Sequence, residues 1–383
     1  MAGDPVRIAY VIGELGTGGA EYQLYELVRG LDRRRYLPRV FALATGGYWA
    51  ARLRELGVDV RELRHVRSAD LSRLLTLRRG LAEFAPQILH TVLWSGNAYG
   101  RLASVGLRIP VVITAERNVV RRPAWQIVFE RALDVVTDRY LVNSQAIVGE
   151  LVDHGRLPRR KMQVIHNGID LGRLPAFDPD RRVARAALGF DPVRRLVVQV
   201  GRLEAQKDYP TFLAAAARVA ARFPDVDFLV VGEGGLRADL EGVARGLGIA
   251  ERVRFTGVRH DVPALLAGCD VCTLTSLYEG LPNVVIEAMA TGAVAVATDV
   301  GGARELVASG ETGYVVPARD VEAVASATTA VLADPERARA MAVAARRRIE
   351  AGFTVEAMVR DTSAAYDELL RAAGAGAPVR RAA

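Results

Sequence analysis

Short apolar runs alternate with longer amphipathic segments along the whole chain. This alternation is typical of repeated strand–helix units around a parallel sheet. In the first half it predicts strands at residues 6–12, 38–43, 58–63, 88–91, 111–114, 139–142 and 162–166. In the second half it predicts strands at residues 196–201, 227–232, 253–256, 271–274, 293–298 and 313–315. The pattern therefore indicates an α/β protein with two doubly wound, Rossmann-like sheets.

A turn-rich stretch separates the two sets of strands. Asn-Gly-Ile-Asp at residues 167–170 is followed by Pro175 and by Asp-Pro-Asp at residues 178–180. Such residues favour turns over helices and strands. We therefore expect an N-terminal domain over residues 1–172 and a C-terminal domain over residues 183–353.

The end of the chain is rich in Ala, Arg and Gly. Helical segments are predicted after Pro335, the last of them over residues 354–371. Residues 372–383 are predicted to form a disordered tail, because terminal residues are poorly ordered unless packing holds them.

Length and composition fit an ordinary multidomain protein. The chain has 383 residues, of which 50% are hydrophobic and 25% charged, so two or three domains with full cores are expected. Two cysteines cannot make a disulfide framework, which favours a cytoplasmic location. The apolar run at residues 8–12 is too short for a signal-peptide core, and no run is long enough to span a bilayer.

Positive charge gathers in the N-terminal half. Residues 1–185 hold 29 of the 51 basic and 19 of the 44 acidic side chains, a net +10 that leaves −3 for the rest. This asymmetry indicates a half that faces phosphate groups of a nucleic acid, an anionic membrane or a phosphorylated acceptor, or else an excess of solvated arginines. Only Lys161 and Lys207 are lysines.

A glycine-rich turn follows the first predicted strand at residues 13–21. It opens a helix, so the backbone amides of Gly18 and Gly19 could hold a phosphate at the helix N-terminus. Glu21 stands where the dinucleotide fingerprint has its third glycine, which argues against an NAD enzyme. Tight packing of the turn is the alternative use of these glycines.

A more specific pattern begins at Gly201, directly after a predicted strand. Arg202 and Lys207 lie five residues apart in this loop. Two cations at the carboxyl end of a strand suit a pyrophosphate, with a surface ion-pair loop as the alternative.

Two glutamates, Glu279 and Glu287, flank a second such loop. Gly280 and Pro282 force a turn after the first, and a helix is predicted to begin at about Asn283. The helix N-terminus offers amides for a phosphate, and Glu287, one turn into the helix, can accept hydrogen bonds from ribose hydroxyls.

These segments resemble the retaining GT-B glycosyltransferases of glycosyltransferase family four. The likeness covers about residues 6–331 and rests on a Glu-(seven residues)-Glu motif at Glu279 and Glu287. Five further motifs follow the family's order, at residues 18–21, 167–170, 201–207, 232–234 and 255–257. The resemblance implies a GT-B fold, in which two Rossmann-like domains face each other across a nucleotide-sugar cleft and the last helix packs back on the N-terminal domain.

The resemblance also implies roles for individual residues. Arg202 and Lys207 would neutralise the nucleotide diphosphate, Glu287 would hold the ribose, and Glu279 would contact hydroxyls of the donor sugar. No metal cofactor would be required, because Arg, Lys and backbone amides can stabilise the charge on a departing diphosphate. Further donor contacts are implied for Gly18, Gly19, Gly201, Gly232, Arg254, Phe255, Thr256, Gly257, Gly280, Leu281, Asn283 and Val284.

The chain departs from the family near residue 116. Many members carry a histidine after the strand that corresponds to residues 111–114, whereas this chain has Glu116 and Arg117. Either could take that catalytic place. His90, at the end of the preceding strand, is another candidate, with a hydrogen-bonded structural histidine as the alternative.

The resemblance implies that a hexose is transferred with retention from a UDP- or GDP-sugar to an acceptor. The basic N-terminal half favours a lipid-linked or phosphorylated glycan of cell-envelope polysaccharide synthesis, and peripheral contact with an anionic membrane at its cytoplasmic face. No nucleic-acid partner is expected, because no basic segment is interleaved with aromatic residues. The alternatives are a GT-B sugar-nucleotide epimerase or hydrolase and a non-catalytic nucleotide-sugar sensor.

Two other motifs have structural interpretations. Asp-x-Asp occurs at residues 225–227 and 178–180, but at the amino end of a predicted strand and in the linker, so we expect no metal site at either. Cys269 and Cys272 form a single Cys-x-x-Cys, which lacks the second pair that zinc would need, and are expected at a helix end and in a strand.

Overall fold

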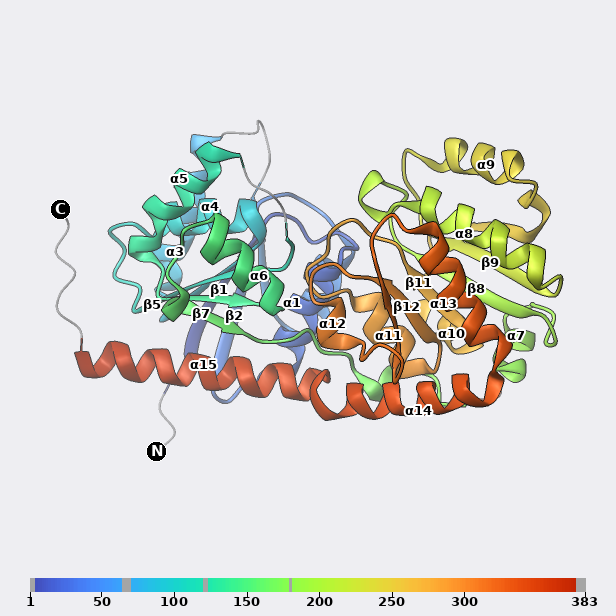
Figure 1. The fold of residues 1–383 in the computed structure, drawn as a ribbon. Coiled ribbons are helices and arrows are strands. Elements are labelled where there is room, and N and C mark those ends of the chain that lie inside the picture. The colour runs from blue at the N-terminus through green and yellow to red at the C-terminus, as the bar shows by residue number, and fades with distance from the viewer. Residues whose placement is uncertain (1–3, 64–69, 120–122, 179–180, 377–383) are drawn as a thin grey trace. The chain divides into compact units, whose positions relative to one another are not determined.

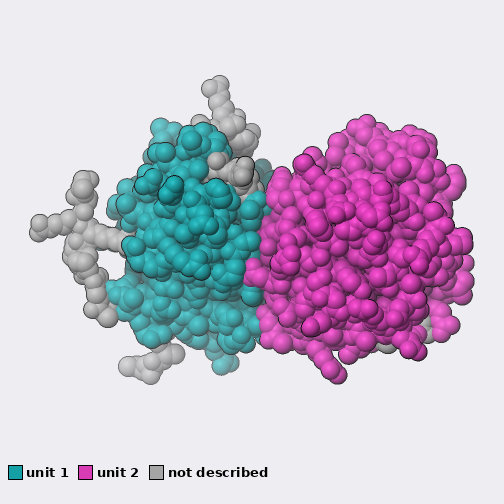
Figure 2. All heavy atoms as spheres, viewed as in Figure 1, with its two compact units in different colours: residues 1–168, 355–383 teal, residues 169–354 magenta. Residues whose placement is uncertain are grey.

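The computed structural model describes residues 4–63, 70–119, 123–178 and 181–376. The chain forms two compact units, drawn in different colours in Figure 2: unit 1 contains residues 1–168 and 355–383, and unit 2 contains residues 169–354. Residues 169–172, which the sequence analysis places in the N-terminal domain, belong to unit 2. Within the described ranges, every helix is too short or too polar to cross a lipid bilayer.

The core of unit 1 is a parallel sheet with the strand order β3-β2-β1-β4-β5-β6-β7 (Figure 1). Its strands are β1 (Val6–Ile12), β2 (Tyr36–Ala42), β3 (Asp59–Glu62), β4 (Ile88–Val92), β5 (Val111–Glu116), β6 (Arg139–Val142) and β7 (Met162–Val164). Its helices are α1 (Gly19–Gly30), α2 (Tyr48–Glu55), α3 (Leu71–Phe84), α4 (Leu93–Ser104), α5 (Ala124–Leu133), α6 (Gln145–Gly149) and α15 (Val355–Gly376).

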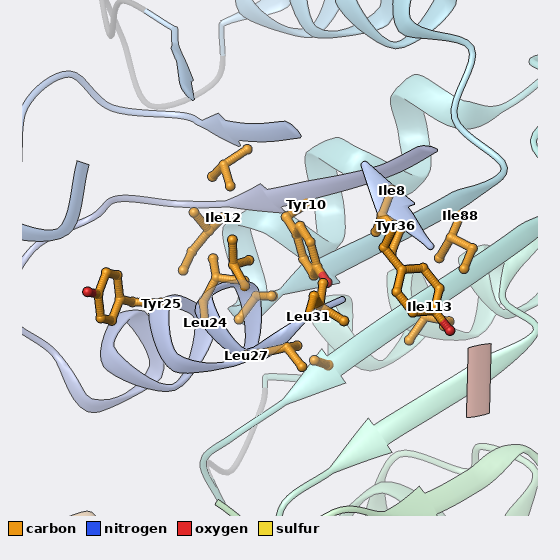
Figure 3. Close-up of a cluster of buried hydrophobic side chains, with 14 of the residues drawn as sticks. Ile8, Tyr10, Ile12, Leu24, Tyr25, Leu27, Leu31, Tyr36, Ile88 and Ile113 are labelled. Atoms are coloured by element: carbon orange, nitrogen blue, oxygen red, sulfur yellow. The ribbon is translucent and has the colours of Figure 1, made fainter. Parts of the chain in front are cut away.

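Alternate residues of β1 enter two different cores, because successive side chains of a strand point to opposite faces. Ile8, Tyr10 and Ile12 pack with residues of α1, α2 and α15; Figure 3 shows Ile12 beside Leu24 of α1, and Ile8 beside Tyr36 of β2 and Ile88 of β4. Residues 9 and 11 pack on the other face, against α3 and α4. Helices therefore cover both faces of the sheet, and both faces must be apolar.

The last helix, α15, completes the first of these cores. Tyr366 is fully buried, and its hydroxyl lies 3.0 Å from that of Tyr10. Gly30 of α1 allows a close approach, since a Cβ there would lie 2.6 Å from Cγ2 of Val359. The helix continues to Gly376, so the predicted end at residue 371 is wrong; residues 377–383 of the expected tail lie outside the described residues.

Unit 2 repeats the scheme with the strand order β10-β9-β8-β11-β12-β13, all parallel. Its strands are β8 (Arg195–Val200), β9 (Val226–Val231), β10 (Val253–Gly257), β11 (Val271–Leu274), β12 (Val294–Thr298) and β13 (Gly313–Val316). Its helices are α7 (Arg182–Ala187), α8 (Tyr209–Arg222), α9 (Arg237–Gly246), α10 (Val262–Gly268), α11 (Asn283–Thr291), α12 (Ala303–Leu306), α13 (Val321–Ala333) and α14 (Pro335–Gly352). Each predicted strand agrees with an observed one to within about two residues at either end, which confirms the α/β, doubly wound fold class.

Candidate functional site

The candidate site lies at the carboxyl ends of the strands of unit 2. The strand order reverses between β8 and β11, which are neighbours in the sheet although two strand–helix units separate them along the chain. Doubly wound sheets bind ligands at such a switch point, outside the carboxyl ends of the strands. The site is therefore expected in the loops that follow β8 and β11.

Lys207 and Glu279 meet between these two loops. Nζ of Lys207 lies 2.5 Å from Oε1 of Glu279, and both side chains are largely buried. The hydroxyl of Ser276 donates a second hydrogen bond to the same oxygen, at 2.7 Å. The lysine lies over Gly201, since a Cβ there would come within 3.0 Å of its Cε. The sequence predicted both side chains as site residues, and the structure brings them together.

Hydrogen bonds to the backbone fix the lysine loop. The carbonyl oxygen of Lys207 accepts from Nε2 of Gln199 (3.1 Å) and from the hydroxyl of Thr275 (2.9 Å). The hydroxyl of Tyr209 donates to the carbonyl oxygen of Gly201 at 2.8 Å. These supporting residues were not predicted from the sequence, although a glutamine within a largely apolar strand is a signal for them.

Arg202 lies in the same loop but is oriented differently. Its side chain is 71% exposed, and Nη1 lies 3.2 Å from Oε1 of Glu204. An exposed ion pair of this kind contributes little to stability and exchanges easily. Arg202 therefore remains available to a ligand without being fixed in a preformed position.

Glu287 projects from the first turns of α11, which begins directly after Pro282. Burial raises the pKa of its carboxyl group to about 7, although part of the side chain still reaches the surface. Within the described part of the chain, no group donates a hydrogen bond to this carboxylate. A carboxylate that lacks a protein donor in a largely desolvated position can accept hydrogen bonds from a ligand.

Apolar side chains and backbone groups both occur at the helix N-terminus beside Glu287. The side chain of Leu281 is buried in an apolar cluster with Val285 and Ile286, so only its backbone can face a ligand. Asn283 and Val284 form the first helical positions, where the positive end of the helix dipole favours an anion. That backbone amides hold a phosphate here stays a prediction.

Glycines allow the strand ends to approach closely. Gly232 has a φ of 135°, and a Cβ there would lie 2.0 Å from the carbonyl oxygen of Gly201. Its amide donates to the carbonyl oxygen of Gly257 at 2.9 Å, and Gly257 also has a positive φ of 74°. A side chain at either position would be strained or would clash, so these glycines hold the ends of β8, β9 and β10 together.

The structure separates Arg254 from this group. Arg254 pairs in register with Leu229 rather than with the end of β9, and its guanidinium lies 5.0 Å from the ring centroid of Phe190. Phe255 packs against the core on the other face of the sheet. Of the segment implied to contact the base, Thr256 and Gly257 are the residues at the carboxyl end of β10.

The glycine turn of unit 1 differs from the expectation. Gly18 is the N-cap of α1, and Gly19 is its first residue. The carboxylate of Glu21 folds back over this end, with Oε2 only 2.3 Å from where a Cβ of Gly18 would be. Glu21 is buried. A carboxylate of the chain itself therefore lies beside the amides that were expected to hold a phosphate, and it interacts favourably with the helix N-terminus.

Glu116 is the last residue of β5 and Arg117 follows it, and both have buried polar partners. Nδ2 of Asn97 donates to Oε1 of Glu116 at 2.6 Å. Nη1 of Arg117 donates to Oδ1 of Asn167 at 2.7 Å, and burial lowers the pKa of Arg117 to about 10. Asn97 was not found from the sequence, because a single amide on a helix carries no periodic signal.

His90 belongs to the core of unit 1 rather than to a site. Its Nδ1 lies 2.6 Å from the hydroxyl of Tyr366 on α15, and the ring is buried on the face of the sheet that α15 covers. Burial, reinforced by the charge of Arg117, lowers the pKa of His90 to about 3. A histidine held neutral in this way has a structural role, which was the alternative interpretation of the sequence.

The two remaining motifs also have structural roles. Asp225 and Asp227 form ion pairs with Arg195 (2.8 Å) and Arg194 (2.6 Å) at the amino end of β9. Cys269 follows α10, and Cys272 lies in β11; both are buried thiols. Across the described ranges, no three His, Cys, Asp or Glu side chains gather as a metal site would require.

Two doubly wound parallel units, with a cation–carboxylate pair at the switch point of the second, define a GT-B glycosyltransferase. Residues 180–348 match the family model "Glycosyl transferases group 1", and residues 17–173 match "Glycosyltransferase Family 4". The chain therefore belongs to the GT-B glycosyltransferases that combine these two family regions. It is an enzyme that transfers a sugar from a nucleotide sugar.

Several known proteins are similar to most of this chain. The D-inositol 3-phosphate glycosyltransferase of Segniliparus rotundus is 35% identical over 314 residues, which cover 76% of this chain and 68% of the relative. The alpha-D-kanosaminyltransferase of Streptomyces kanamyceticus is 31% identical over 304 residues, 76% of this chain and 75% of the relative. Anabaena HepE, solved with UDP and glucose, superposes with a TM-score of 0.84 at 22% identity over 95% of this chain and 100% of HepE.

Proposed function

We propose that the enzyme transfers a hexose, with retention, from a UDP-sugar to a phosphorylated or lipid-linked glycan acceptor. The observation that carries the proposal is the Lys207–Glu279 pair at 2.5 Å, with Glu287 on the adjacent helix. UDP is favoured over GDP because the similar HepE structure was solved with UDP. A phosphorylated acceptor is favoured by the basic N-terminal half and by the inositol 3-phosphate named for a relative.

The pair is arranged to bind both parts of the donor. An ammonium group has three N–H donors, and Glu279 takes one of those on Lys207, so the others can bind oxygens of the diphosphate. Oε1 of Glu279 accepts from Lys207 and Ser276, whereas no described residue donates to Oε2. Oε2 can therefore accept from a sugar hydroxyl.

Catalysis then depends on charge that develops on the departing diphosphate. Lys207 is held in place before the donor binds, so its charge needs little reorganisation when the bond to the sugar breaks. Arg202 can swing in from solvent to a second phosphate oxygen. The chain's own role is to bind, orient and neutralise, and the departing phosphate can take up the acceptor proton. Glu287 would hold the ribose, and Arg117 or Glu116 would take the place of the histidine that many family members carry.

We also propose that α5 gives unit 1 a peripheral contact with an anionic membrane. It exposes Trp125 (63%) and Val128 (65%) beside Arg131, and exposed apolar and basic side chains together favour the membrane interface. Vesicles containing phosphatidylglycerol should sediment the enzyme, and Trp125→Ser with Val128→Ser should abolish this. Equal sedimentation of the double variant would contradict the proposal.

The experiment for the main proposal is UDP release from UDP-sugars, with and without a phosphorylated acceptor such as inositol 3-phosphate. Transfer that requires the acceptor, with the product's anomeric configuration matching that of the donor by NMR, supports it. An inverted anomer overturns retention. Equal UDP release without an acceptor indicates a hydrolase, and isomerised donor indicates an epimerase.

A further inference from the structure

A cavity lies at the amino end of the unit 2 sheet, opposite the candidate site. It has a volume of about 420 Å³ and is lined by residues of α7, of the amino ends of β8 and β11, and of the junction of α13 and α14. Arg195, on its wall, is the first residue of β8. Because β8 has six residues, each rising about 3.3 Å, this cavity is about 20 Å from the Lys207 loop.

Arginines dominate its lining. Arg181, Arg182, Arg185, Arg195 and Arg339 line the cavity, and Asp270 is the one carboxylate among the lining residues that the structure describes. The remaining wall is largely apolar. A concave site of this size with a few convergent polar groups has the properties of a small-molecule pocket.

Among the described residues, five arginines and one carboxylate line the cavity. Asp270 is shared, because Oδ2 accepts from Arg185 at 2.6 Å, while Nη1 of Arg181 lies 3.9 Å from Oδ1. Arg195 is paired outside the lining with Asp225 at 2.8 Å, and its Nη1 donates to the carbonyl oxygen of Leu332 at 2.9 Å. Arg339 is exposed on α14, and no described residue forms a hydrogen bond or ion pair with its side chain. Among the residues that line the cavity, positive charge is therefore in excess.

Arg181 and Arg185 have structural roles, which separates them from the exposed Arg182 and Arg339. Arg185 donates through Nε to the carbonyl oxygen of Gly268 at 2.7 Å, and Arg181 donates to that of Gly292. Both are buried. Burial lowers the pKa of Arg181, and the charges of Arg185 and Arg339 add to this effect, against that of Asp270. An anion in the cavity would relieve this repulsion.

We propose that this cavity binds a phosphorylated small molecule, with Arg182, Arg195 and Arg339 donating to its phosphoryl oxygens. Guanidinium groups present planar pairs of donors that match phosphate oxygens. The carbon skeleton of the ligand lies against the apolar wall at Val331 and Pro335. The site is separate from the donor site and does not depend on which sugar the enzyme transfers.

Glucose 6-phosphate and inorganic phosphate are suitable probes for calorimetric titration of the intact protein. Saturable binding should weaken at least tenfold in Arg339→Glu and in Arg182→Glu. Arg347→Glu is the matched control: it makes the same charge change at an exposed position of α14 that does not line the cavity. UDP-sugar binding should be unchanged in all three variants, which separates this site from the donor site.

Three results would overturn the proposal. The first is non-saturating binding, or binding equally weakened in Arg339→Glu and Arg347→Glu, which is a general ionic effect. The second is competition between glucose 6-phosphate and the UDP-sugar. The third is an absence of probe binding together with phosphatidylglycerol vesicle binding that Arg339→Glu abolishes, because the arginines would then serve a lipid surface instead.

Discussion

Nζ of Lys207 lies 2.5 Å from Oε1 of Glu279, although 72 positions of the chain separate the two residues. They meet because β8 and β11 are paired in the sheet, with Val197 opposite Val271. Each residue follows its strand within a loop at the switch point. The fold thus joins two sequence motifs, each ambiguous alone, into one charged pair beside the N-terminus of α11.

Replacing Lys207 by alanine should remove the preformed charge for the diphosphate. We expect kcat/KM for the UDP-sugar to fall by about 10²–10³-fold, the range found when one preorganised donor is lost. Lys161→Ala is a close control, because Lys161 is the other lysine of the chain and also forms a partly buried ion pair, with Asp134 at 3.0 Å. Steady-state kinetics on both variants provide the measurement; equal losses would mean that the Lys207 effect is merely structural.

Replacing Gly232 by alanine should destabilise unit 2. The new Cβ would meet the carbonyl oxygen of Gly201 at 2.0 Å, at a φ of 135°. We expect a loss of at least about 2 kcal/mol, since strained backbone and a clash both contribute. Gly235→Ala is the control, because no atom lies within 4 Å of its Cβ position, and it should change stability by less than about 0.5 kcal/mol. Chemical denaturation measures both; similar stabilities would contradict the close approach.

The central strands could be predicted because they are buried on both faces, so they are apolar runs such as Val294–Thr298 with turn residues after them. Polar pairs between residues far apart in the sequence could not be predicted. The contact of His90 with Tyr366 joins residues 276 positions apart and leaves no local pattern. The register of β10, which the sequence does not specify, places Arg254 before the strand end, so its contact with the base stays a prediction.

The position of Glu21 could have been found. It follows the N-cap Gly18 by three residues, which is the spacing at which a glutamate commonly folds back on a helix N-terminus. The same short spacing should have indicated that the carboxylate competes with a phosphate for these amides. The local sequence therefore specifies the position of the Glu21 carboxylate at the helix N-terminus, whereas the partners of Glu116 and Arg117 depend on the fold.

Replacing His90 by phenylalanine should change how stability depends on pH. Burial and Arg117 lower the folded-state pKa of His90 to about 3, whereas it is about 6.5 in the unfolded chain. Below pH 6.5 the unfolded chain binds a proton that the folded chain does not, so His90 causes stability to fall as the pH drops toward 3. The slope is at most about 1.4 kcal/mol per pH unit.

In His90→Phe this slope should disappear, while about 1 kcal/mol is lost near neutral pH with the Tyr366 hydrogen bond. Urea denaturation between pH 4 and 8 measures both effects. His154→Phe is the control, because His154 is exposed on the surface of unit 1. If His90→Phe and wild type lose stability in parallel on acidification, the histidine is not held neutral as the structure indicates.

Glu287 should have the opposite effect to His90 on the pH dependence of stability. Burial raises its folded-state pKa to about 7, from an unfolded value of about 4.3. Between these values the folded chain retains a proton that the unfolded chain has lost, so Glu287 lowers stability as the pH rises through this window, by at most about 1.4 kcal/mol per pH unit. Glu287→Gln should therefore be progressively more stable than wild type from pH 5 to pH 8, whereas Glu311→Gln, at an exposed position of unit 2, should not be.

Ionisation of the Glu287 carboxyl group should also govern the affinity for the donor. A ribose hydroxyl donates more strongly to a charged carboxylate than to a neutral carboxyl group, so the affinity of the wild type for UDP should rise as the pH increases through about 7. Glu287→Gln should bind UDP more weakly at pH 8 and show no such rise. Calorimetric titration across this range tests the trend. A variant that is stabilised at pH 8 yet binds UDP as tightly as wild type would show that the buried charge serves no ligand. The combination of greater stability with weaker binding would instead mean that the fold tolerates an unfavourable charge because the donor requires it.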